Sequence, residues 1–225
     1  MRFNSPDEYI QYLAQGGRSE NNIYSCVQLL TKALEKNPLS WVHEFGFNGL
    51  NQVLRILYEI FQNNKPYERI QYECIRCLIA FGNNTVGLKA LIEHQEALMI
   101  VVLFLDPSKP GTMYEALKLL GVTCLISNDT HKKVLNAVTM NGKLRRHKRF
   151  LPVVQGLMNR QNKDLRAACL QFINSVKQAA STESKRLILE KNAPETKTGI
   201  MDSLLEQLQA GTAFDLLNPG RKRHT

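Results

Sequence analysis

The stretch Tyr72-Glu-Cys-Ile-Arg-Cys-Leu78 recurs as Tyr114-Glu-Ala-Leu-Lys-Leu-Leu120, so that Tyr72 and Tyr114 stand 42 positions apart. The residues from Asp164 to Asn174 resemble both stretches more weakly. A period of this length is typical of armadillo and HEAT units, in which stacked helices bury a shared core and display a concave face. Two similar heptads can also arise by chance in any all-helical protein, but an α-solenoid is the better interpretation.

Apolar side chains recur at intervals of three and four along most of the chain, which is the pattern of amphipathic helices. The stripes that this spacing defines are Ile23, Cys26, Val27, Leu30 and Leu34; Leu50, Val53, Leu54, Leu57, Ile60 and Phe61; Ile70, Cys74, Cys77, Leu78 and Phe81; Val86, Leu88, Leu91 and Ile92; Leu117, Leu120, Cys124 and Leu125; Val134, Leu135 and Val138; Phe150, Val153, Val154 and Leu157; and Leu165, Cys169, Phe172, Ile173 and Val176. Residues 99–105 alone resemble a strand, and we expect a helix there too because no second strand could pair with them. The sequence predicts an all-α fold.

Helix boundaries are marked by capping and helix-breaking residues. Ser5-Pro-Asp-Glu8 offers a capping serine, proline at the first helical position and a glutamate three residues after the serine. Gly16-Gly17, Asn37-Pro38 and Asn63-Asn64 each predict the end of a helix. Gly82 to Gly87, which encloses Asn83-Asn84, predicts a further boundary.

Composition and charge exclude several classes of protein. With 225 residues and 44% hydrophobic content the chain can bury a substantial core, and five cysteines without an apolar N-terminal signal favour a reduced, intracellular setting. The longest apolar run, residues 97–105, is far shorter than the roughly twenty residues of a membrane-spanning helix. A net charge of +9 and a pI near 9.4 favour acidic partners without choosing among them.

Catalytic and metal-binding patterns are weak in this sequence. Cys74-Ile-Arg-Cys77 has the C-x-x-C spacing, but it lies inside a helical stripe without a second cysteine pair, so buried core thiols are the favoured interpretation. The histidines are isolated, and neither a phosphate-binding glycine loop nor a nucleophile elbow occurs. We therefore expect no enzyme, no metal and no cofactor.

Near the C-terminus, residues 199–211 read Gly-Ile-Met-Asp-Ser-Leu-Leu-Glu-Gln-Leu-Gln-Ala-Gly. On a helix, Met201, Leu204, Leu205 and Leu208 form one apolar stripe with polar residues opposite. A helix this short is marginal in water by itself. It either packs on its own domain as an ordinary terminal helix or lies in a groove as a ligand.

Four motifs resemble one known family in their order and spacing. They are Asn37-Pro-Leu-Ser-Trp-Val-His-Glu-Phe45 with Gly49-Leu50, Cys77-Leu-Ile-Ala-Phe-Gly-Asn-Asn-Thr-Val-Gly87, Lys118-Leu-Leu-Gly-Val-Thr-Cys-Leu125 and Cys169-Leu-Gln-Phe-Ile-Asn174. Over about residues 5–176 they resemble the armadillo-repeat inhibitory domain of diaphanous-related formins. Residues 199–211 resemble the autoregulatory segment of the same family, which binds that domain.

The resemblance implies a fold, a function and a set of site residues. The fold is an armadillo-like α-solenoid, a right-handed superhelix of helix groups, followed by a C-terminal amphipathic helix. The groove would hold the autoregulatory helix, and this bound state would inhibit actin assembly. A Rho-family GTPase would release the helix from the groove. The implied groove residues are Asn83, Val122, Leu125, Gln171 and Asn174, and the implied helix residues are Met201, Leu204, Leu205 and Leu208.

The resemblance also implies partners and a location. Asn37 matches a position that faces the GTPase, whereas Lys32 and Glu35 replace the apolar and amide residues expected beside it. A basic tail of Arg221, Lys222 and Arg223 would aid docking of the helix to an acidic patch. The implied location is the cytoplasm, with the actin cytoskeleton as an indirect partner, although the chain has no room for the actin-assembling region of the family.

The expected organisation is an inhibitory domain in residues 1–180, a flexible linker in 181–198, and the autoregulatory helix with its basic tail in 199–225. A tether of about twenty residues has a root-mean-square span near 25 Å, against a domain radius of gyration of about 16 Å. The helix could therefore reach a groove on its own domain or, in a swapped dimer, on a second copy. The alternative function is a free armadillo-type adaptor that binds peptides of other proteins.

Residues 143–149, Lys-Leu-Arg-Arg-His-Lys-Arg, are strongly basic. A solvated connector is the simplest interpretation, and docking to acidic protein, phosphoinositide or nucleic acid is the alternative. No aromatic residue interleaves with these cations to stack on bases, so we do not expect nucleic acid as the partner.

Overall fold

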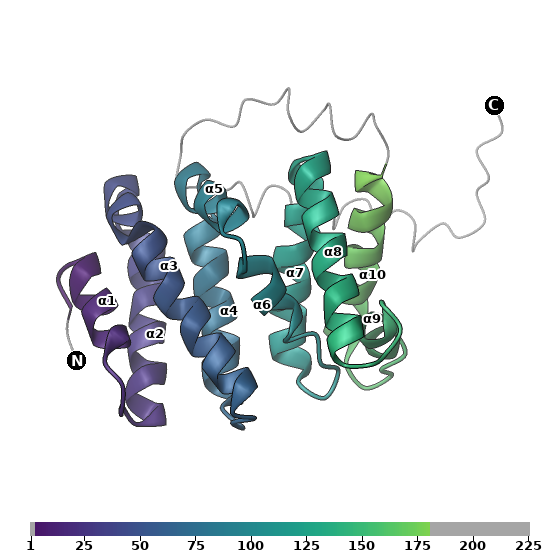
Figure 1. The fold of residues 1–225 in the computed structure, drawn as a ribbon, viewed down its shortest axis with the longest axis horizontal. Helices are drawn as coiled ribbons and strands as arrows, with labels where there is room; N and C mark the ends of the chain where they lie inside the picture. The colour runs from purple at the N-terminus through teal and green to yellow at the C-terminus, as the bar shows by residue number, and fades with distance from the viewer. Residues whose placement is uncertain (1–2, 181–225) are drawn as a thin grey trace.

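The computed structural model describes residues 3–180, in which ten α-helices and no strand occur (Figure 1). The helices are α1 Pro6–Ala14, α2 Glu20–Lys36, α3 Leu39–Gln62, α4 Glu68–Gly82, α5 Thr85–Glu93, α6 Ala97–Val102, α7 Pro110–Ile126, α8 Asn128–Leu144, α9 Leu151–Leu157 and α10 Lys163–Ala179. The predicted all-α fold is confirmed, including a helix at α6 where the sequence resembles a strand.

The helices stack in two layers (Figure 1). Helices α2, α4, α7 and α10, here called the inner layer, contact one another in that order. Helices α3, α5, α6 and α8 follow one another along the other side, with α1 on α3 and α9 on α10. This is the arrangement of an armadillo-like helical solenoid, as the sequence period predicts.

The sequence repeat coincides with the structural repeat. The heptad that begins at Tyr72 lies in α4, the heptad that begins at Tyr114 lies in α7, and residues 164–174 lie in α10. These are consecutive helices of the inner layer and pack directly on one another. Their equivalent places in the stack favour a true repeat over a chance similarity of the two heptads.

The two central inner helices, α4 and α7, are buried on most of their circumference, because each packs between two neighbours in its own layer and against the outer layer. In α7, every residue from Ala116 to Leu125 is buried except Lys118. In α4 the partly exposed positions are Tyr72, Arg76 and Ile79, which recur at helical spacing. Each of these two helices therefore presents one narrow strip to solvent.

The cysteines belong to the core. All five lie within residues 3–180, and all are free and buried. Burial raises the pKa of Cys26 and of Cys124 to about 12, and it raises the pKa of Cys74 well above its ordinary value. These thiols stay protonated and unreactive at neutral pH, so the prediction that Cys74 and Cys77 are core residues is confirmed.

The expected helix boundaries are present. The Ser5 hydroxyl accepts a hydrogen bond from the Glu8 N–H at the start of α1. Helices α2 and α3 end directly before Asn37-Pro38 and Asn63-Asn64. The Asn84 side chain accepts from the Gly87 N–H at 2.8 Å and so caps α5.

Two positions on the expected apolar stripes are not covered. Val154 in α9 is 44% exposed and Ile173 in α10 is 37% exposed. Periodicity predicts the side of a helix that is apolar, but burial needs a neighbour on that side. α9 and α10 are the last helices that the structure describes, and in residues 3–180 no further helix packs over them.

In the described part of the chain, no helix combines the length and the apolar character that crossing a membrane requires.

The α4–α5 corner depends on a glycine, which yields a stability prediction. An added Cβ at Gly87 would lie 1.7 Å from the Phe81 carbonyl oxygen. We expect Gly87→Ala to lower the free energy of unfolding by about 2 to 3 kcal/mol, because the corner must open to admit the methyl group. Urea denaturation followed by circular dichroism measures the change.

Gly111 provides the matched control. A Cβ there meets only Tyr72 at 3.7 Å, which is ordinary van der Waals contact. Gly111→Ala should be neutral or stabilise by up to about 1 kcal/mol, because alanine favours the helix. Equal stability of the two variants would contradict the assignment of a tight corner at Gly87.

Candidate functional site

The inner layer is hollowed between α2, α4 and α7. The hollow encloses about 360 Å³. Its lining residues are Glu35 from α2, Arg76, Ile79, Ala80 and Asn83 from α4 and its C-cap, and Glu115 and Lys118 from α7. We call this concavity the inner groove. It is lined by side chains of both charge signs together with the apolar Ile79 and Ala80, which suits an amphipathic partner.

Two ion pairs with equivalent positions in the repeat underlie the groove. Arg76 lies 3.5 Å from the Glu73 carboxylate in α4, and Lys118 lies 3.1 Å from the Glu115 carboxylate in α7. Both glutamates are buried, whereas Arg76 is 40% exposed. Both cations line the groove, each beside a buried carboxylate, and Glu115 itself is also part of the lining.

An aromatic ring supports each cation. The Arg76 guanidinium lies 5.8 Å from the centroid of the Tyr72 ring, and the Lys118 ammonium lies 5.2 Å from that of Tyr114. Ring and carboxylate together restrict where each cation can lie. The groove thus offers two cations at fixed positions on neighbouring helices, which is a good arrangement for an acidic side chain at the edge of a bound helix.

The predicted groove residues fall on consecutive inner helices. Asn83, the C-cap of α4, lines the inner groove. Val122 and Leu125 lie in α7 and are buried in the core, with 0% and 4% exposure. Gln171 and Asn174 lie in α10 and are half-buried. Of the five, Asn83 alone is among the residues that line the described hollow.

Motif reasoning missed most of the groove lining, namely Arg76, Ile79, Ala80, Glu115 and Lys118. The signal that could have found three of them, Arg76, Glu115 and Lys118, is the repeat itself. Positions 72, 73 and 76 carry Tyr, Glu and Arg, and positions 114, 115 and 118 carry Tyr, Glu and Lys. A polar pattern that recurs inside an apolar helical repeat indicates the strip that stays in contact with solvent.

Other predicted positions lie away from the groove or outside the described residues. The Asn37 side chain, at the C-cap of α2, donates to the Ala33 carbonyl at 3.0 Å. Lys32 is exposed in α2, whereas Glu35, exposed in the same helix, is the exception because it lines the inner groove. The helix residues Met201, Leu204, Leu205 and Leu208 and the tail Arg221–Arg223 lie outside the described residues.

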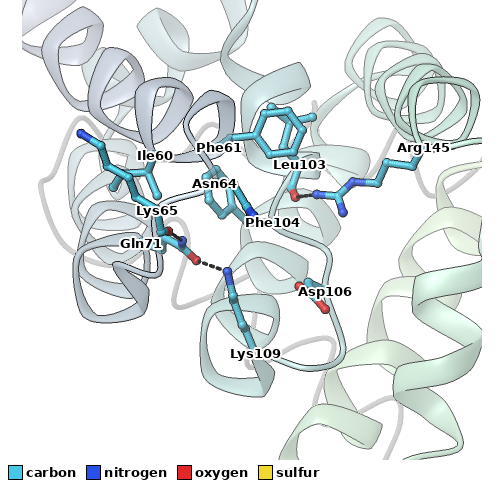
Figure 2. Close-up of a pocket in the computed structure, with 10 residues that line it drawn as sticks. All are labelled: Ile60, Phe61, Asn64, Lys65, Gln71, Leu103, Phe104, Asp106, Lys109 and Arg145. Atoms are coloured by element: carbon cyan, nitrogen blue, oxygen red, sulfur yellow. Dashed lines mark hydrogen bonds between the residues drawn. The ribbon is translucent and has the colours of Figure 1, made fainter.

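A second, smaller cavity of about 130 Å³ lies where α3 ends, between the α6–α7 connection and the end of α8 (Figure 2). Arg145 donates to the Leu103 carbonyl at 2.6 Å, and Lys109 donates to the Gln71 side chain at 3.2 Å (Figure 2). Because these polar groups are engaged with one another, we interpret this cavity as the junction of three repeats.

A metal site has no basis in the described residues. In residues 3–180, no group of three or more His, Cys, Asp or Glu side chains could hold a metal ion. His94, which bonds to Asn51, has a lowered pKa because burial disfavours its charged form.

A helical solenoid with a polar concavity on its inner layer is a binding module of the armadillo type. Comparison with known families specifies it further. Residues 1–125 match the family model of the diaphanous GTPase-binding domain, and residues 68–195 match that of the FHOD1/3 FH3 domain. The chain belongs to the diaphanous family of formin regulatory regions, as its motifs indicate.

Similarity to curated relatives supports the same family assignment. The chain is 38% identical over 197 residues to Protein diaphanous of Drosophila melanogaster, which covers 84% of the chain. It is 34% identical over 177 residues to human Protein diaphanous homolog 2, covering 76% of the chain, and 28% identical over 180 residues to human Disheveled-associated activator of morphogenesis 1, again 76%. The chain spans 16 to 18% of the length of these relatives.

The buried Glu73 carboxylate yields a second prediction. We expect Arg76→Met to lower the free energy of unfolding by about 2 kcal/mol, because it leaves this carboxylate buried without its cation. Adding Glu73→Leu should restore most of the loss, since an apolar pair replaces the ion pair. Urea denaturation of both single variants and the double variant measures the coupling.

The exposed pair between Lys89 and Glu93, 3.9 Å apart in α5, is the control. Lys89→Met should change stability by no more than about 0.5 kcal/mol, because water screens this pair. An Arg76→Met loss as small as the Lys89→Met loss would show that Glu73 is satisfied without Arg76.

Proposed function

We propose that this chain is a non-enzymatic regulatory module of a diaphanous-related formin, and that its inner groove binds the amphipathic segment 199–211. The single observation that carries the proposal is the inner groove itself, with Asn83 in its lining and the cations of Arg76 and Lys118 beside it. Membership of the diaphanous family supports it.

The two proposed partners are chemically complementary. The segment carries Met201, Leu204, Leu205 and Leu208 on one face of a helix, with Asp202 at the edge of that face. The groove offers Ile79 and Ala80 as apolar contacts and Arg76 and Lys118 as cations. A helix laid with its stripe inward would bring Asp202 to the cations at the rim.

The expected binding free energy is large enough to keep the segment in the groove. At about 1.5 to 3 kcal/mol for each large apolar side chain, four anchors supply roughly 6 to 12 kcal/mol before ordering costs. A micromolar contact needs about 8 kcal/mol. Attachment to the same chain raises the effective concentration of the segment to the millimolar range, so even a micromolar contact would keep the groove occupied.

The proposed regulation is autoinhibition of actin assembly, relieved by a Rho-family GTPase. The family match of residues 1–125 to a GTPase-binding domain supports the GTPase as partner. Asn37 lies at the α2–α3 corner within that range, one helix away from α4 and its groove residues. A GTPase held there would act on the groove through α2, which packs on α4. The implied location is the cytoplasm, at the actin cytoskeleton.

Competition in the full chain tests the groove. A fluorescent peptide of residues 199–211 should bind the Leu204→Asp/Leu208→Asp chain at least tenfold more tightly than the unaltered chain, because the altered tail no longer occupies the groove. Adding Lys118→Glu to the double variant should weaken the peptide again by about tenfold, since Asp202 loses a cation. Fluorescence anisotropy measures both affinities.

Two control variants test whether these effects are specific to the groove and to the apolar face of the segment. Ser203→Ala/Gln209→Ala alters the opposite face of the same segment and should leave competition unchanged. Tyr58→Ala alters an exposed residue of the outer helix α3 and should leave peptide binding unchanged. Equal peptide affinity for the unaltered and Leu204→Asp/Leu208→Asp chains would refute cis occupation of the groove. Tight binding of unrelated peptides instead would identify a free adaptor.

GTPase release makes a separate prediction. A GTP-loaded Rho-family GTPase should lower the affinity of the Leu204→Asp/Leu208→Asp chain for the peptide, and Asn37→Ala should weaken GTPase binding about tenfold. Asn63→Ala is a matched control, because Asn63 also caps its helix by donating to the carbonyl four residues back, Glu59, at 2.8 Å. If the two alanine variants bind the GTPase equally, Asn37 has no part in the contact. Calorimetric titration measures both affinities.

A further inference from the structure

The positive charge of the chain is concentrated in one segment. Residues 130–163 contain nine Lys and Arg and no Asp or Glu. Because the whole chain has 29 Lys and Arg against 20 Asp and Glu, the other residues are balanced at twenty of each. The net charge of +9 is therefore the charge of this segment alone, which comprises most of α8, the α8–α9 connection, α9 and the start of α10.

Within the segment, the cations of the α8–α9 connection divide into two groups. Arg145 and Arg149 are engaged with the fold, since they donate to the carbonyls of Leu103 and Leu135. Lys143, Arg146 and Lys148 are exposed, and within residues 3–180 no carboxylate forms an ion pair with any of them. These three cations are available to an external anion.

Apolar side chains are exposed around the same connection. In residues 3–180 there are eight large hydrophobic side chains that are exposed, and five of the eight fall between Met140 and Met158. Leu144, directly before the connection, is 63% exposed, and Leu151 and Val154 follow it. Leu151 and Val154 are three residues apart and so share one face of α9.

The connection is held in a defined shape. Its backbone folds back closely on α8. The close approach is shown at Gly142, where an added Cβ would lie only 3.0 Å from the His147 carbonyl oxygen. Arg146 adopts a positive φ of 56°, and the Arg149 guanidinium reaches back to Leu135 at 2.8 Å. The corner thus presents its cations and flanking apolar residues at one edge of the solenoid, where α8 ends and α9 begins (Figure 1).

We propose that this corner docks on an anionic membrane surface. Its docking patch comprises the cations Lys143, Arg146 and Lys148 and the apolar side chains Leu144, Leu151 and Val154. The cations would bind lipid phosphates and carboxylates, while the apolar side chains enter the region between headgroups and acyl chains. This patch lies outside the inner groove, so its occupation does not depend on the proposed function.

Charge complementarity selects a membrane over the other anionic surfaces. A nucleic acid would be held by cations with exposed aromatic rings that stack on bases, but the two rings beside these cations, Phe61 under Arg145 and Phe150 under Arg149, are half-buried. Exposed leucine and valine contribute nothing to phosphate binding in water, whereas they favour insertion into lipid. The combination of unpaired cations with exposed aliphatic side chains therefore fits a lipid surface best.

Vesicle cosedimentation of the full chain tests the proposal. The chain should bind vesicles of phosphatidylcholine with about 30% phosphatidylserine and not bind vesicles of phosphatidylcholine alone. Because each cation near an anionic surface is worth roughly fivefold in affinity, Lys143→Gln/Arg146→Gln/Lys148→Gln should weaken binding on the order of a hundredfold. Leu144→Ser/Leu151→Ser, which keeps the charge, should weaken it about tenfold.

Matched variants separate a site from a general charge effect. Lys32→Gln/Lys36→Gln/Lys89→Gln removes the same charge from exposed positions of α2 and α5, and Tyr58→Ser removes an exposed apolar side chain from α3. Both should leave vesicle binding within about twofold of the unaltered chain. Circular dichroism melting of each variant confirms that it is folded.

Three results would overturn the proposal. They are the absence of binding to anionic vesicles, an equal loss in the control triple variant, and tighter binding of duplex DNA or RNA than of vesicles through the same three cations. The last result would identify the corner as a nucleic-acid contact instead.

Discussion

The structure depends on the burial of the two central inner-layer helices, α4 and α7, on almost every side. An isolated helix group cannot cover its own apolar surface, so each group must stack on the next, and the stack closes around α4 and α7 most completely. The consequence is that only one strip of each of these two helices meets solvent. On α4 and α7 that strip carries Arg76, Ile79 and Lys118, and the inner groove follows from it.

The same packing constraint explains why the groove has charged side chains in its lining and why these side chains are held in place. A carboxylate at Glu73 or Glu115 is tolerated in a buried repeat because a cation one helical turn away compensates its charge. That cation must then lie at the surface of the strip, supported by Tyr72 or Tyr114. One short polar pattern, used twice, thus both completes the packing and supplies charged side chains to the lining of the inner groove.

The molecule also separates its surfaces by charge. The inner groove mixes Glu35 and Glu115 with Arg76 and Lys118, so it is close to neutral and suits a helix with mixed charges. The charged side chains of the α8–α9 corner are all cations, with no Asp or Glu among them. Because the two surfaces involve different helices, a membrane contact at the corner and a peptide in the groove can coexist, and an inhibited module could be held at a lipid surface.

The sequence by itself determined the helices, their caps, the repeat and the family, because these depend on local periodicity and on short motifs such as Asn37–Phe45. It also indicated Asn83, which the family resemblance implies as a groove residue and which lines the inner groove. Only the tertiary structure decided that Val122 and Leu125 are buried beneath the inner face while Lys118 reaches the groove. It likewise decided that Val154 and Ile173 stay exposed. Periodicity specifies which side of a helix is apolar, but only the packing of neighbouring helices specifies which part of that side is covered.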